Sequence, residues 1–456
     1  MPTEGRTLGK IDLGKETSMR PTEPLSKTET KLKRIRWLSE KDPKREYHNL
    51  MHLFNEDSLR ECFNELDGRK AVGADGIDKE TYREHLEENL RKLIVKMEKM
   101  AYRPGPVRQV LIPKAGNPKE KRPLGIGNFE DKIVQKMMQK VLESIYDPQF
   151  FKCSYGFRRG MGCHDAIKDL HQHLFRSEVQ TVIDIDLSNF FGSICHKEAV
   201  EILRKRIKDN NLIRYIVRMF KSGVLTNGEL TVSDEGVMQG SPCSPTIANI
   251  FAHYVIDEWF EEVVKSHCKG RVNLFRYGDD AVICCQYEED AARIKRALSN
   301  RLGKYKLKLN EEKTSCVSFS RRGYQQGKKQ GVFHFLGFTF FWGRTRKGKP
   351  IPKVETQGKR MRAKLKNVNE WAKQVRNKYR LAYIWRLFCS KLEGHIRYYG
   401  VSFNCGRVGG FVLKAVRIFF KWINRRSQRK SFDWEKFTLF LKEHPSPIIK
   451  VHHSLF

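Results

Sequence analysis

Alternation of apolar and polar residues predicts a strand at residues 181–187, which read Thr-Val-Ile-Asp-Ile-Asp-Leu. Because successive side chains of a strand point to opposite faces, Val182, Asp184 and Asp186 share one face and the apolar residues between them share the other. The apolar face should pack on helices. The acidic face should look into a cleft, since burial of unpaired carboxylates is costly.

Two apolar runs further along, Val272 to Phe275 and Ala281 to Cys285, are separated by Tyr277-Gly278-Asp279-Asp280. This pattern predicts a hairpin that holds two carboxylates at a strand end, where such groups bind hard divalent cations. A Gly-Asp turn alone is a weak signal. With Asp186 it makes three carboxylates, and two Mg²⁺ ions held by three aspartates is the chemistry of nucleotide polymerisation.

Helical periodicity dominates residues 50–97, with a loop at 73–76, and returns from Phe129 to Tyr146. Residues 107–113 read as a strand, and residues 114–122 as a basic turn. A later helix is predicted to start at Ser244-Pro245, with Ser244 as its N-cap and the proline as its first residue. Its core face should consist of Ile247, Phe251, Tyr254 and Val255.

The first residues and a later run are strongly polar. Residues 1–45 are charged and contain Pro21, Pro24 and Pro43, so we expect them to be largely disordered, or ordered only on RNA. Residues 342–380 carry fourteen Lys or Arg and two acidic residues, an imbalance that favours a polyanionic partner. A helical period runs through this segment and predicts an amphipathic helix with a basic face. Its apolar positions are Met361, Leu365, Val368, Ala372, Val375 and Tyr379.

Composition narrows the function classes. The 456 residues exceed the usual size of one domain, and 39% of them are hydrophobic, enough for a large core. The net charge of +34 favours nucleic acid as the partner over the alternative of a merely soluble basic protein. The eleven cysteines form no C-x-x-C pair. We therefore expect a reduced, cytoplasmic protein without a zinc finger, membrane span or signal peptide.

Seven ordered motifs resemble those of bacterial group II intron-encoded reverse transcriptases and maturases, and the resemblance covers about residues 45–430. The motifs are KRPLGI at 121–126, SYGFR at 154–158, DIDLSNFF at 184–191, QGSPCSP at 239–245, RYGDD at 276–280, EKT at 312–314 and FLGF at 335–338. Seven motifs in the family's order are far more specific than any one of them.

The resemblance implies an α+β fold with the right-hand polymerase architecture: fingers, a palm built on an antiparallel sheet backed by helices, and a helical thumb. The implied boundaries are 46–180 for the fingers, 181–340 for the palm and 341–430 for the thumb or maturase domain. A polar extension at 1–45 and a short DNA-contacting tail at 431–456 complete the expected organisation. We expect no H-N-H endonuclease segment after the thumb, in which case a mobile-intron protein of this kind would prime from an existing strand end.

The resemblance further implies RNA-directed DNA polymerase activity. Asp186, Asp279 and Asp280 match the family's catalytic aspartates, which with the Leu187 carbonyl would hold two Mg²⁺ ions, or Mn²⁺ in their place. Asp184 lies off the motif position and reads as an outer-sphere or surface acid.

Further positions match nucleotide- and primer-contacting residues. Lys114 and Arg122 would neutralise the triphosphate, Phe191 would exclude a ribose 2′-hydroxyl, and its neighbour Phe190 reads as core. Gln239 would hydrogen-bond the nucleotide or template beside Gly240, which permits close approach to the new base pair. Lys313 would protonate the leaving pyrophosphate, with a plain surface lysine equally open. The primer grip would comprise Phe335, Leu336, Gly337 and Phe338.

The implied partners are an RNA template such as a group II intron RNA, a DNA primer, a target DNA and dNTPs, and a second copy of the chain is an open alternative. The implied location is the bacterial cytoplasm, in association with the nucleoid. Phosphate contacts are expected from basic residues. These are Arg158, Lys359, Arg360, Arg362, Lys364 and Lys366.

Two positions depart from the family pattern. Gly278 stands where the family mostly has Ala, and Gly192 where it often has Asp. Three rivals stay open: a splicing cofactor whose polymerase site is a relic, an RNA-dependent RNA polymerase, and a relative recruited to DNA repair or phage defence.

Overall fold

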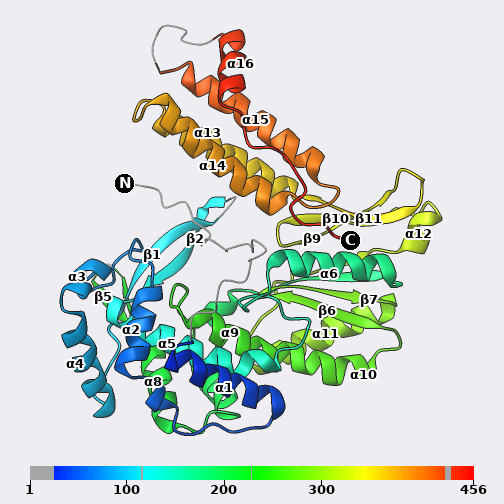
Figure 1. Ribbon diagram of the computed structural model, residues 1–456. Helices are drawn as coiled ribbons and strands as arrows, with labels where there is room; N and C mark the ends of the chain where they lie inside the picture. Colours follow the sequence, from blue (N-terminus) through cyan, green and yellow to red (C-terminus); the bar gives the residue numbers. More distant parts are fainter. Residues whose placement is uncertain (1–24, 115–116, 227, 427–432) are drawn as a thin grey trace.

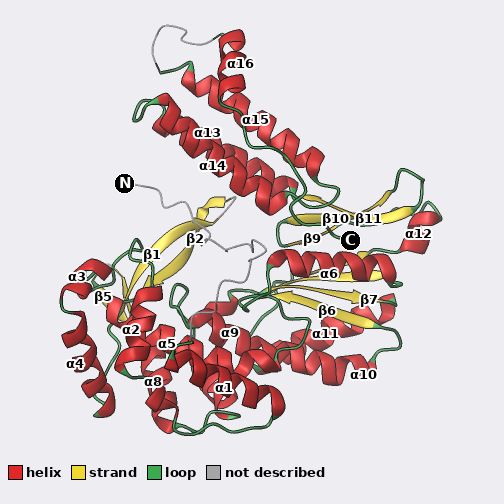
Figure 2. Cartoon of the chain, in the orientation of Figure 1, coloured by secondary structure: helices red, strands yellow, loops and turns green. Residues whose placement is uncertain are grey.

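The computed structural model describes residues 25–114, 117–226, 228–426 and 433–456, and leaves the side chains of residues 114–120 aside. Helices and strands alternate irregularly along the chain, so the fold is mixed α+β, as the sequence predicted (Figure 2). Three parts can be distinguished: a part of helices and a long hairpin that contains most of the N-terminal half, a central sheet, and a C-terminal group of helices (Figure 1).

The N-terminal part is helical around a four-stranded sheet. Its sheet has the order β2-β1-β4-β5, in which β1 (Val107–Lys114) and β2 (Asn117–Ile126) form the antiparallel hairpin and β4 (Val224–Thr226) runs parallel to β1. Its strand β2 replaces much of the basic turn expected at 114–122. The helices are α2 (Glu56–Glu65), α3 (Lys79–Glu84), α4 (Leu86–Glu98), α5 (Phe129–Tyr146), α7 (His196–Arg204) and α8 (Asn210–Phe220), and β5 is Glu229–Thr231.

The central sheet is antiparallel throughout, with the order β6-β7-β3-β8. Its strands are β3 (Thr181–Asp186), β6 (Val272–Tyr277), β7 (Asp280–Cys285) and β8 (Ser315–Ser318). The face with Ile183 and Ile185 belongs to the larger apolar core, which includes residues of α9 (Ser244–Ala252) and α11 (Glu288–Lys304). This confirms the expected packing of the apolar face on helices.

The opposite face of this sheet is more covered than expected. Val182 and Val282 lie in a second apolar core, together with residues of α6 (Cys163–Arg176) and of the C-terminal helices. The acidic positions therefore occupy only the end of an otherwise buried face.

A three-stranded sheet links the central sheet to the C-terminal helices. It consists of β9 (Phe333–Phe335), β10 (Phe338–Arg344) and β11 (Pro350–Thr356), so the boundary expected at 340/341 falls inside β10. The helices that follow are α13 (Gly358–Val375), α14 (Leu381–Tyr399), α15 (Cys405–Ile423) and α16 (Trp434–Glu443). α13 confirms the amphipathic helix, except that Tyr379 lies beyond its end and is exposed.

Both ends of the described chain are anchored on the fold. Residues 27–41 form α1 (Lys27–Lys41), capped by the Ser26 hydroxyl and buried at Leu32, so the expectation of disorder was wrong for this segment. At the other end, Leu455 is buried and His453 stacks on His164 with ring centroids 3.5 Å apart. Residues 1–24 lie outside the described residues. None of the helices in the described part of the chain has the length and apolar character that a bilayer crossing needs.

Candidate active site

The carboxylates singled out in the sequence meet at one end of the central sheet. Asp186 at the end of β3 is the register partner of Asp280 at the start of β7, and Asp279 lies in the two-residue turn before it. Directly paired antiparallel residues have Cα atoms about 4.5–5.5 Å apart. Asp186 and the Tyr277 hairpin are therefore close enough for shared ions to bridge them.

Crowding of negative charge marks this end of the sheet. The Oδ2 atom of Asp280 accepts a hydrogen bond from the Leu336 N–H at 3.2 Å. Burial raises the pKa of Asp280 to about 7, and repulsion from Asp184 and Asp279 adds to the rise. Burial likewise raises the pKa of Asp184 to about 6, and repulsion from Asp186 adds to this rise. The hydrogen bond that the His334 backbone N–H donates to the Asp184 carboxylate opposes the rise.

The donor set suits hard divalent cations in type and position. Several carboxylates converge here, and oxygen is the donor that Mg²⁺ prefers. The bridge between Leu187 and Leu309 uses the Ser188 N–H and the Asp186 carbonyl, so it leaves the Leu187 carbonyl out of that ladder. Among the described residues, no three His, Cys, Asp or Glu side chains are already grouped closely enough to hold a metal ion. Side-chain rearrangement would have to complete such a site.

Lys313 reaches the same cluster. Its Nζ lies 3.5 Å from Asp186 Oδ2, although both side chains are substantially exposed. A lysine that contacts the acidic cluster is placed where it can meet a phosphate group, and a surface lysine paired with Asp186 would make the same contact.

Aromatic residues pack around the Gly278 turn. Phe190 is buried, which confirms it as core, whereas Phe191 is half-buried and meets Phe157 edge-on at 6.2 Å. Gly278 has φ +67°, and a Cβ there would lie 3.0 Å from the Phe157 ring. Glycine in place of the family's alanine therefore avoids a tight contact between a Cβ at position 278 and the Phe157 ring, which in turn contacts Phe191.

The nucleotide-contacting candidates of the N-terminal sheet are only partly placed. Arg122 is exposed on β2, and the Lys114 side chain lies outside the described part of the structure. The Gln239 carbonyl accepts the Gly125 N–H at 2.7 Å. Gly240 has φ +115°, and a Cβ there would lie 2.3 Å from the Gly125 carbonyl oxygen. Gly240 therefore packs directly against the backbone of β2 at Gly125, and this contact requires glycine for a reason that the sequence did not indicate.

The expected primer grip is the turn between β9 and β10. Leu336 and Gly337 form it with φ of 49° and 82°, while Phe335 and Phe338 are buried beneath it. This turn contacts Asp280 through the Leu336 N–H and accepts a 2.8 Å hydrogen bond from the Tyr398 hydroxyl at the Leu336 carbonyl. It therefore connects the acidic cluster to α14.

The basic residues of α13 are mostly free to meet solvent. Lys359, Arg360, Arg362 and Lys366 are exposed. Lys364 differs, because its Nζ lies 4.8 Å from the centre of the Tyr399 ring and burial lowers its pKa to about 8, with Arg360 adding to the effect. Lys364 is partly structural.

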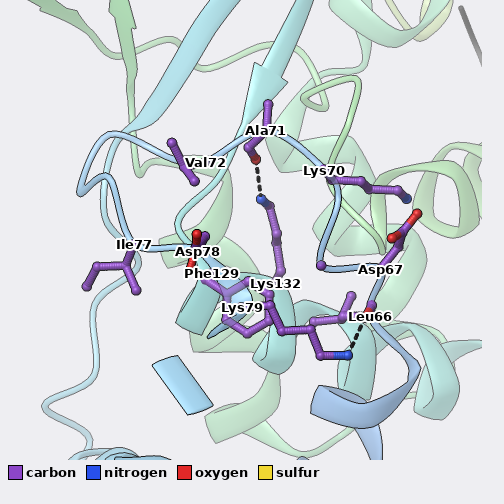
Figure 3. A pocket seen from close by; sticks show the side chains of 11 residues that line it. Leu66, Asp67, Lys70, Ala71, Val72, Ile77, Asp78, Lys79, Phe129 and Lys132 are labelled. Carbon is purple, nitrogen blue, oxygen red and sulfur yellow. Dashed lines mark hydrogen bonds between the residues drawn. The ribbon is translucent and has the colours of Figure 1, made fainter. Parts of the chain in front are cut away.

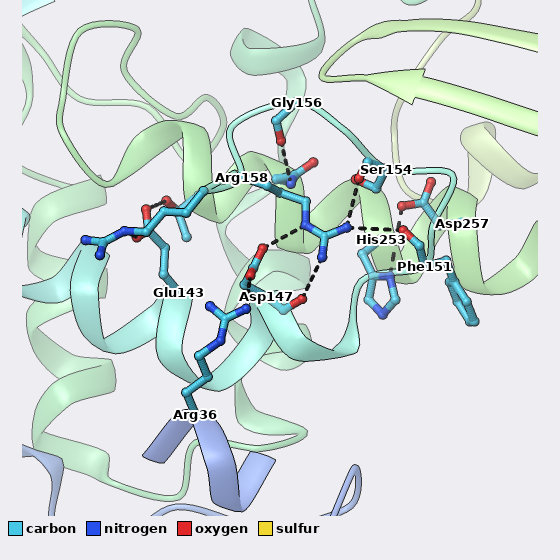
Figure 4. Close-up of polar contacts among 12 residues, drawn as sticks. Arg36, Glu143, Asp147, Phe151, Ser154, Gly156, Arg158, His253 and Asp257 are labelled. Atoms are coloured by element: carbon cyan, nitrogen blue, oxygen red, sulfur yellow. Dashed lines mark hydrogen bonds and ion pairs between the residues drawn. The ribbon is translucent and has the colours of Figure 1, made fainter. Parts of the chain in front are cut away.

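Arg158 has an internal role rather than the expected nucleic-acid contact. Its Nε donates to Asp147 Oδ1 at 2.7 Å, and its terminal nitrogens donate to the carbonyls of Phe151, Ser154 and Asp147 (Figure 4). Its side chain is only 11% exposed. Asp147 also receives Arg36 of α1 at 2.8 Å, so the pair joins three segments of the fold.

Arg276, to which the sequence assigned no role, positions the acidic turn. Its side chain is 1% exposed and donates to Asp257 Oδ1 at 2.6 Å, Ser154 Oγ at 2.7 Å, Asn249 Oδ1 at 2.8 Å and the Gly278 carbonyl at 3.1 Å. An arginine inside an apolar strand was the available signal, because a buried charge needs partners.

Glycine also supports this turn from the other side. A Cβ at Gly156 would lie 2.5 Å from the Gly278 nitrogen, so the SYGFR loop and the RYGDD turn touch backbone to backbone. The Asn249 side chain donates to the Gly156 carbonyl at 3.0 Å and so ties α9 to the same contact.

A small cavity in the N-terminal part is structural. It encloses about 20 Å³ beside the loop at 66–79 and is lined by Lys79 and Lys132, among others (Figure 3). Lys132 donates to the Ala71 carbonyl at 3.0 Å and Lys79 to the Leu66 carbonyl at 2.6 Å. A volume of this size holds about one water molecule, not a nucleotide.

Comparison with known proteins agrees with this geometry. The family model for reverse transcriptases (RNA-dependent DNA polymerases) matches residues 112–340. The group II intron-encoded protein LtrA of Lactococcus lactis is 32% identical over 202 residues, which are 44% of this chain and 33% of LtrA. A protein in the cob intron of Schizosaccharomyces pombe is 33% identical over 213 residues, 46% of this chain and 26% of that protein. Protein YkfC of Escherichia coli is 29% identical over 277 residues, 54% of this chain and 72% of YkfC. The matches thus span about a third or less of the two intron proteins.

Proposed function

Because the chain belongs to the reverse transcriptase (RNA-dependent DNA polymerase) family, we propose that it extends a DNA primer on an RNA template. The observation that supports this most is the register pairing of Asp186 with Asp280, beside Asp279 in the adjoining turn. In this proposal residues 46–180 are the fingers, 181–340 the palm and 341–430 the thumb, with the correction that β4 and β5 join the sheet of the fingers and β10 and β11 lead into the thumb.

Proteins of this family generally use divalent metal ions, and we assign two Mg²⁺ ions, replaceable by Mn²⁺, to Asp186, Asp279, Asp280 and the Leu187 carbonyl. Bound ions of this kind lower the pKa of a primer 3′-hydroxyl and stabilise the charge on the leaving pyrophosphate. The turn of β9 and β10 orients Asp280 through the Leu336 N–H. Lys313, 3.5 Å from Asp186, donates a proton to the pyrophosphate. Phe191 excludes nucleotides that carry a 2′-hydroxyl.

Primer extension on poly(rA)/oligo(dT) with dTTP and Mg²⁺ tests the polymerase. Asp279→Ala should lower the rate roughly 10²–10³-fold, the usual cost of removing one charge-stabilising group. Asp234→Ala is the matched control, because Asp234 is 91% exposed and makes one 4.0 Å ion pair with Lys221. Wild-type protein as inactive as Asp279→Ala would favour the rival of a catalytically silent splicing cofactor. Preference for rNTPs over dNTPs would favour an RNA polymerase.

Intron RNA splicing, as a maturase, and retrohoming are the biological role that we propose. The names of two relatives, LtrA and the cob-intron protein, place those proteins in introns. The exposed basic residues of α13 supply a surface on which intron RNA and the template–primer duplex can be held through their phosphates. A self-splicing assay of the RNA that flanks the gene, with and without protein, tests this role. Unchanged splicing alongside intact primer extension would favour the domesticated enzyme of DNA repair or phage defence.

A further inference from the structure

An open cavity lies at the end of the β9–β11 sheet that is remote from the acidic cluster. Its volume is about 450 Å³, and its walls come from the segment around α12 (Arg321–Gln325), the loop at 327–332 and strand β10. Figure 1 shows α12 beside the far ends of β10 and β11. Strand β10 begins next to the Leu336 turn, and its lining residues Phe341 to Arg344 lie three to six steps of about 3.3 Å, or roughly 10–20 Å, along the strand from its first residue.

The chain segment that forms the cavity carries positive charge alone. Between Glu312 and Glu355 the chain carries ten Lys or Arg and no acidic residue. Three of these cations, Lys328, Lys329 and Arg344, line the cavity and are exposed. Glu355, the next acid along the chain, is already bound by Arg407 through two 2.9 Å hydrogen bonds. Unneutralised cations at this density favour a polyanion.

The walls between these cations are aromatic and apolar. Tyr324 and Trp342 stack with ring centroids 6.2 Å apart, and the Arg344 guanidinium lies 5.8 Å from the Tyr324 ring. Phe341 and Val332 complete the apolar lining, and the Val332 side chain is half exposed. Cations around an aromatic cavity of a few hundred Å³ fit a planar base that carries a phosphate.

We propose that this cavity binds an unpaired nucleotide of a single-stranded nucleic acid, at a site separate from the polymerisation cleft. One base enters against Tyr324 and Phe341, and the adjoining phosphates lie on Lys328, Lys329 and Arg344. The proposal goes beyond primer extension: it gives the enzyme a second contact with a single-stranded segment of its substrate, towards the end of β10 that is farther from the Leu336 turn.

Binding of a fluorescein-labelled ten-residue oligouridylate, followed by anisotropy, tests the site. A saturating unlabelled template–primer hairpin occupies the polymerisation cleft throughout. The triple variant Lys328→Glu/Lys329→Glu/Arg344→Glu should bind at least roughly tenfold more weakly, and the salt dependence should fall by about two units of slope for three lost phosphate contacts. The matched control, Lys197→Glu/Arg296→Glu/Lys304→Glu, makes the same change in net charge at exposed positions of α7 and α11.

Two further comparisons separate a base site from a patch of charge. An abasic oligonucleotide of equal length keeps the phosphates and loses the bases, and it should bind the wild type roughly fivefold or more weakly. Val332→Glu should weaken binding, whereas Val95→Glu, at a comparably exposed valine of α4, should not. An equal loss in the two triple variants, or equal binding of the abasic probe, would overturn the proposal. A deoxyuridylate probe distinguishes RNA from DNA as the strand.

Failure of this site is distinguishable from failure of the polymerase. The triple variant should extend a short pre-annealed primer at the wild-type rate, because none of its residues contacts the acidic cluster. Asp279→Ala should lose extension and keep oligouridylate binding. A variant that loses both would place the three cations in the cleft and contradict the separate site.

Discussion

Replacement of Arg276, alone and together with Asp257, should affect the melting temperature and the rate of primer extension differently, and so tests how the acidic turn is held. Arg276→Met removes a guanidinium that donates to Asp257, Ser154, Asn249 and the Gly278 carbonyl, and it leaves the Asp257 carboxylate buried without its counter-ion. Breaking a buried pair on one side costs about 3–5 kcal/mol. At roughly 2–4 °C per kcal/mol for a folding unit of 150–250 residues, the melting temperature should fall by about 6 °C or more.

The double variant Arg276→Met/Asp257→Leu separates the two roles of Arg276. It removes both charges, so most of the lost stability should return. Primer extension should stay low, because the hydrogen bond to the Gly278 carbonyl is still missing. Arg301→Met is the control, since in the described part of the chain Arg301 donates to the carbonyls of Val255 and Tyr254 and lies over the Tyr305 ring without contacting a carboxylate; its loss should cost about 1 kcal/mol.

Differential scanning fluorimetry measures the melting temperatures, and primer extension is measured at 20 °C, where each variant is folded. An Arg276→Met variant that melts within 2 °C of the wild type would refute the structural role assigned to the guanidinium. Full extension by the double variant would also refute it, because the turn would then not depend on the guanidinium.

Three other changes probe the same region and its surroundings. Gly278→Ala places a Cβ 3.0 Å from the Phe157 ring at φ +67°, so the rate of primer extension should fall by less than about tenfold. The larger side chain of Gly278→Val should lower the rate much further, and equal rates for the two variants would exclude steric control of the turn. Phe191→Val should raise rNTP incorporation relative to dNTP in a competition assay, and an unchanged ratio would assign Phe191 to packing alone. Burial lowers the pKa of His164 to about 4 from its usual 6.5, so the unfolded chain takes up the proton first and the stability contributed by neutral His164 is complete above pH 6.5 and lost as the pH falls towards 4. Melting temperatures between pH 7.5 and 5 should therefore fall less steeply in His164→Gln, and parallel curves would contradict this.

The sequence predicted the elements whose signal is local. The helix Phe129–Tyr146, the alternation of β3 and the hairpin at Tyr277 follow from periodicity within a short window, and the structure has each of them. The predicted core residues Ile247, Phe251, Tyr254 and Val255 are all buried, although the last two lie in the π-helical segment His253–Asp257 that continues α9. The cap of α9 was wrong by one residue: Cys243 is the N-cap, and Ser244 lies inside the helix with its hydroxyl buried and without a described partner.

Features that depend on distant segments were out of reach. The polar composition of residues 27–41 hides a helix, because its stability comes from a few buried side chains that pack on α5 and from the Arg36–Asp147 ion pair. The same limit explains Arg158. Its motif position suggests a surface cation, but Asp147, eleven residues away, binds it from the end of another helix. Only tertiary structure distinguishes an arginine that is free to bind a phosphate from one that is already paired with a carboxylate.

The acidic turn is held by contacts from two separate groups of elements. Arg276 and the Gly156–Gly278 contact fix the turn to α9 and to the loop after α5. The Leu336 N–H binds Asp280, and the Leu336 carbonyl accepts a hydrogen bond from the Tyr398 hydroxyl of α14. A shift of α14 that breaks the Tyr398 bond removes one of the contacts that hold the Leu336 turn, which donates a hydrogen bond to the carboxylate whose pKa is about 7. The position of the C-terminal helices and the orientation of Asp280 are therefore linked through two hydrogen bonds and a single two-residue turn.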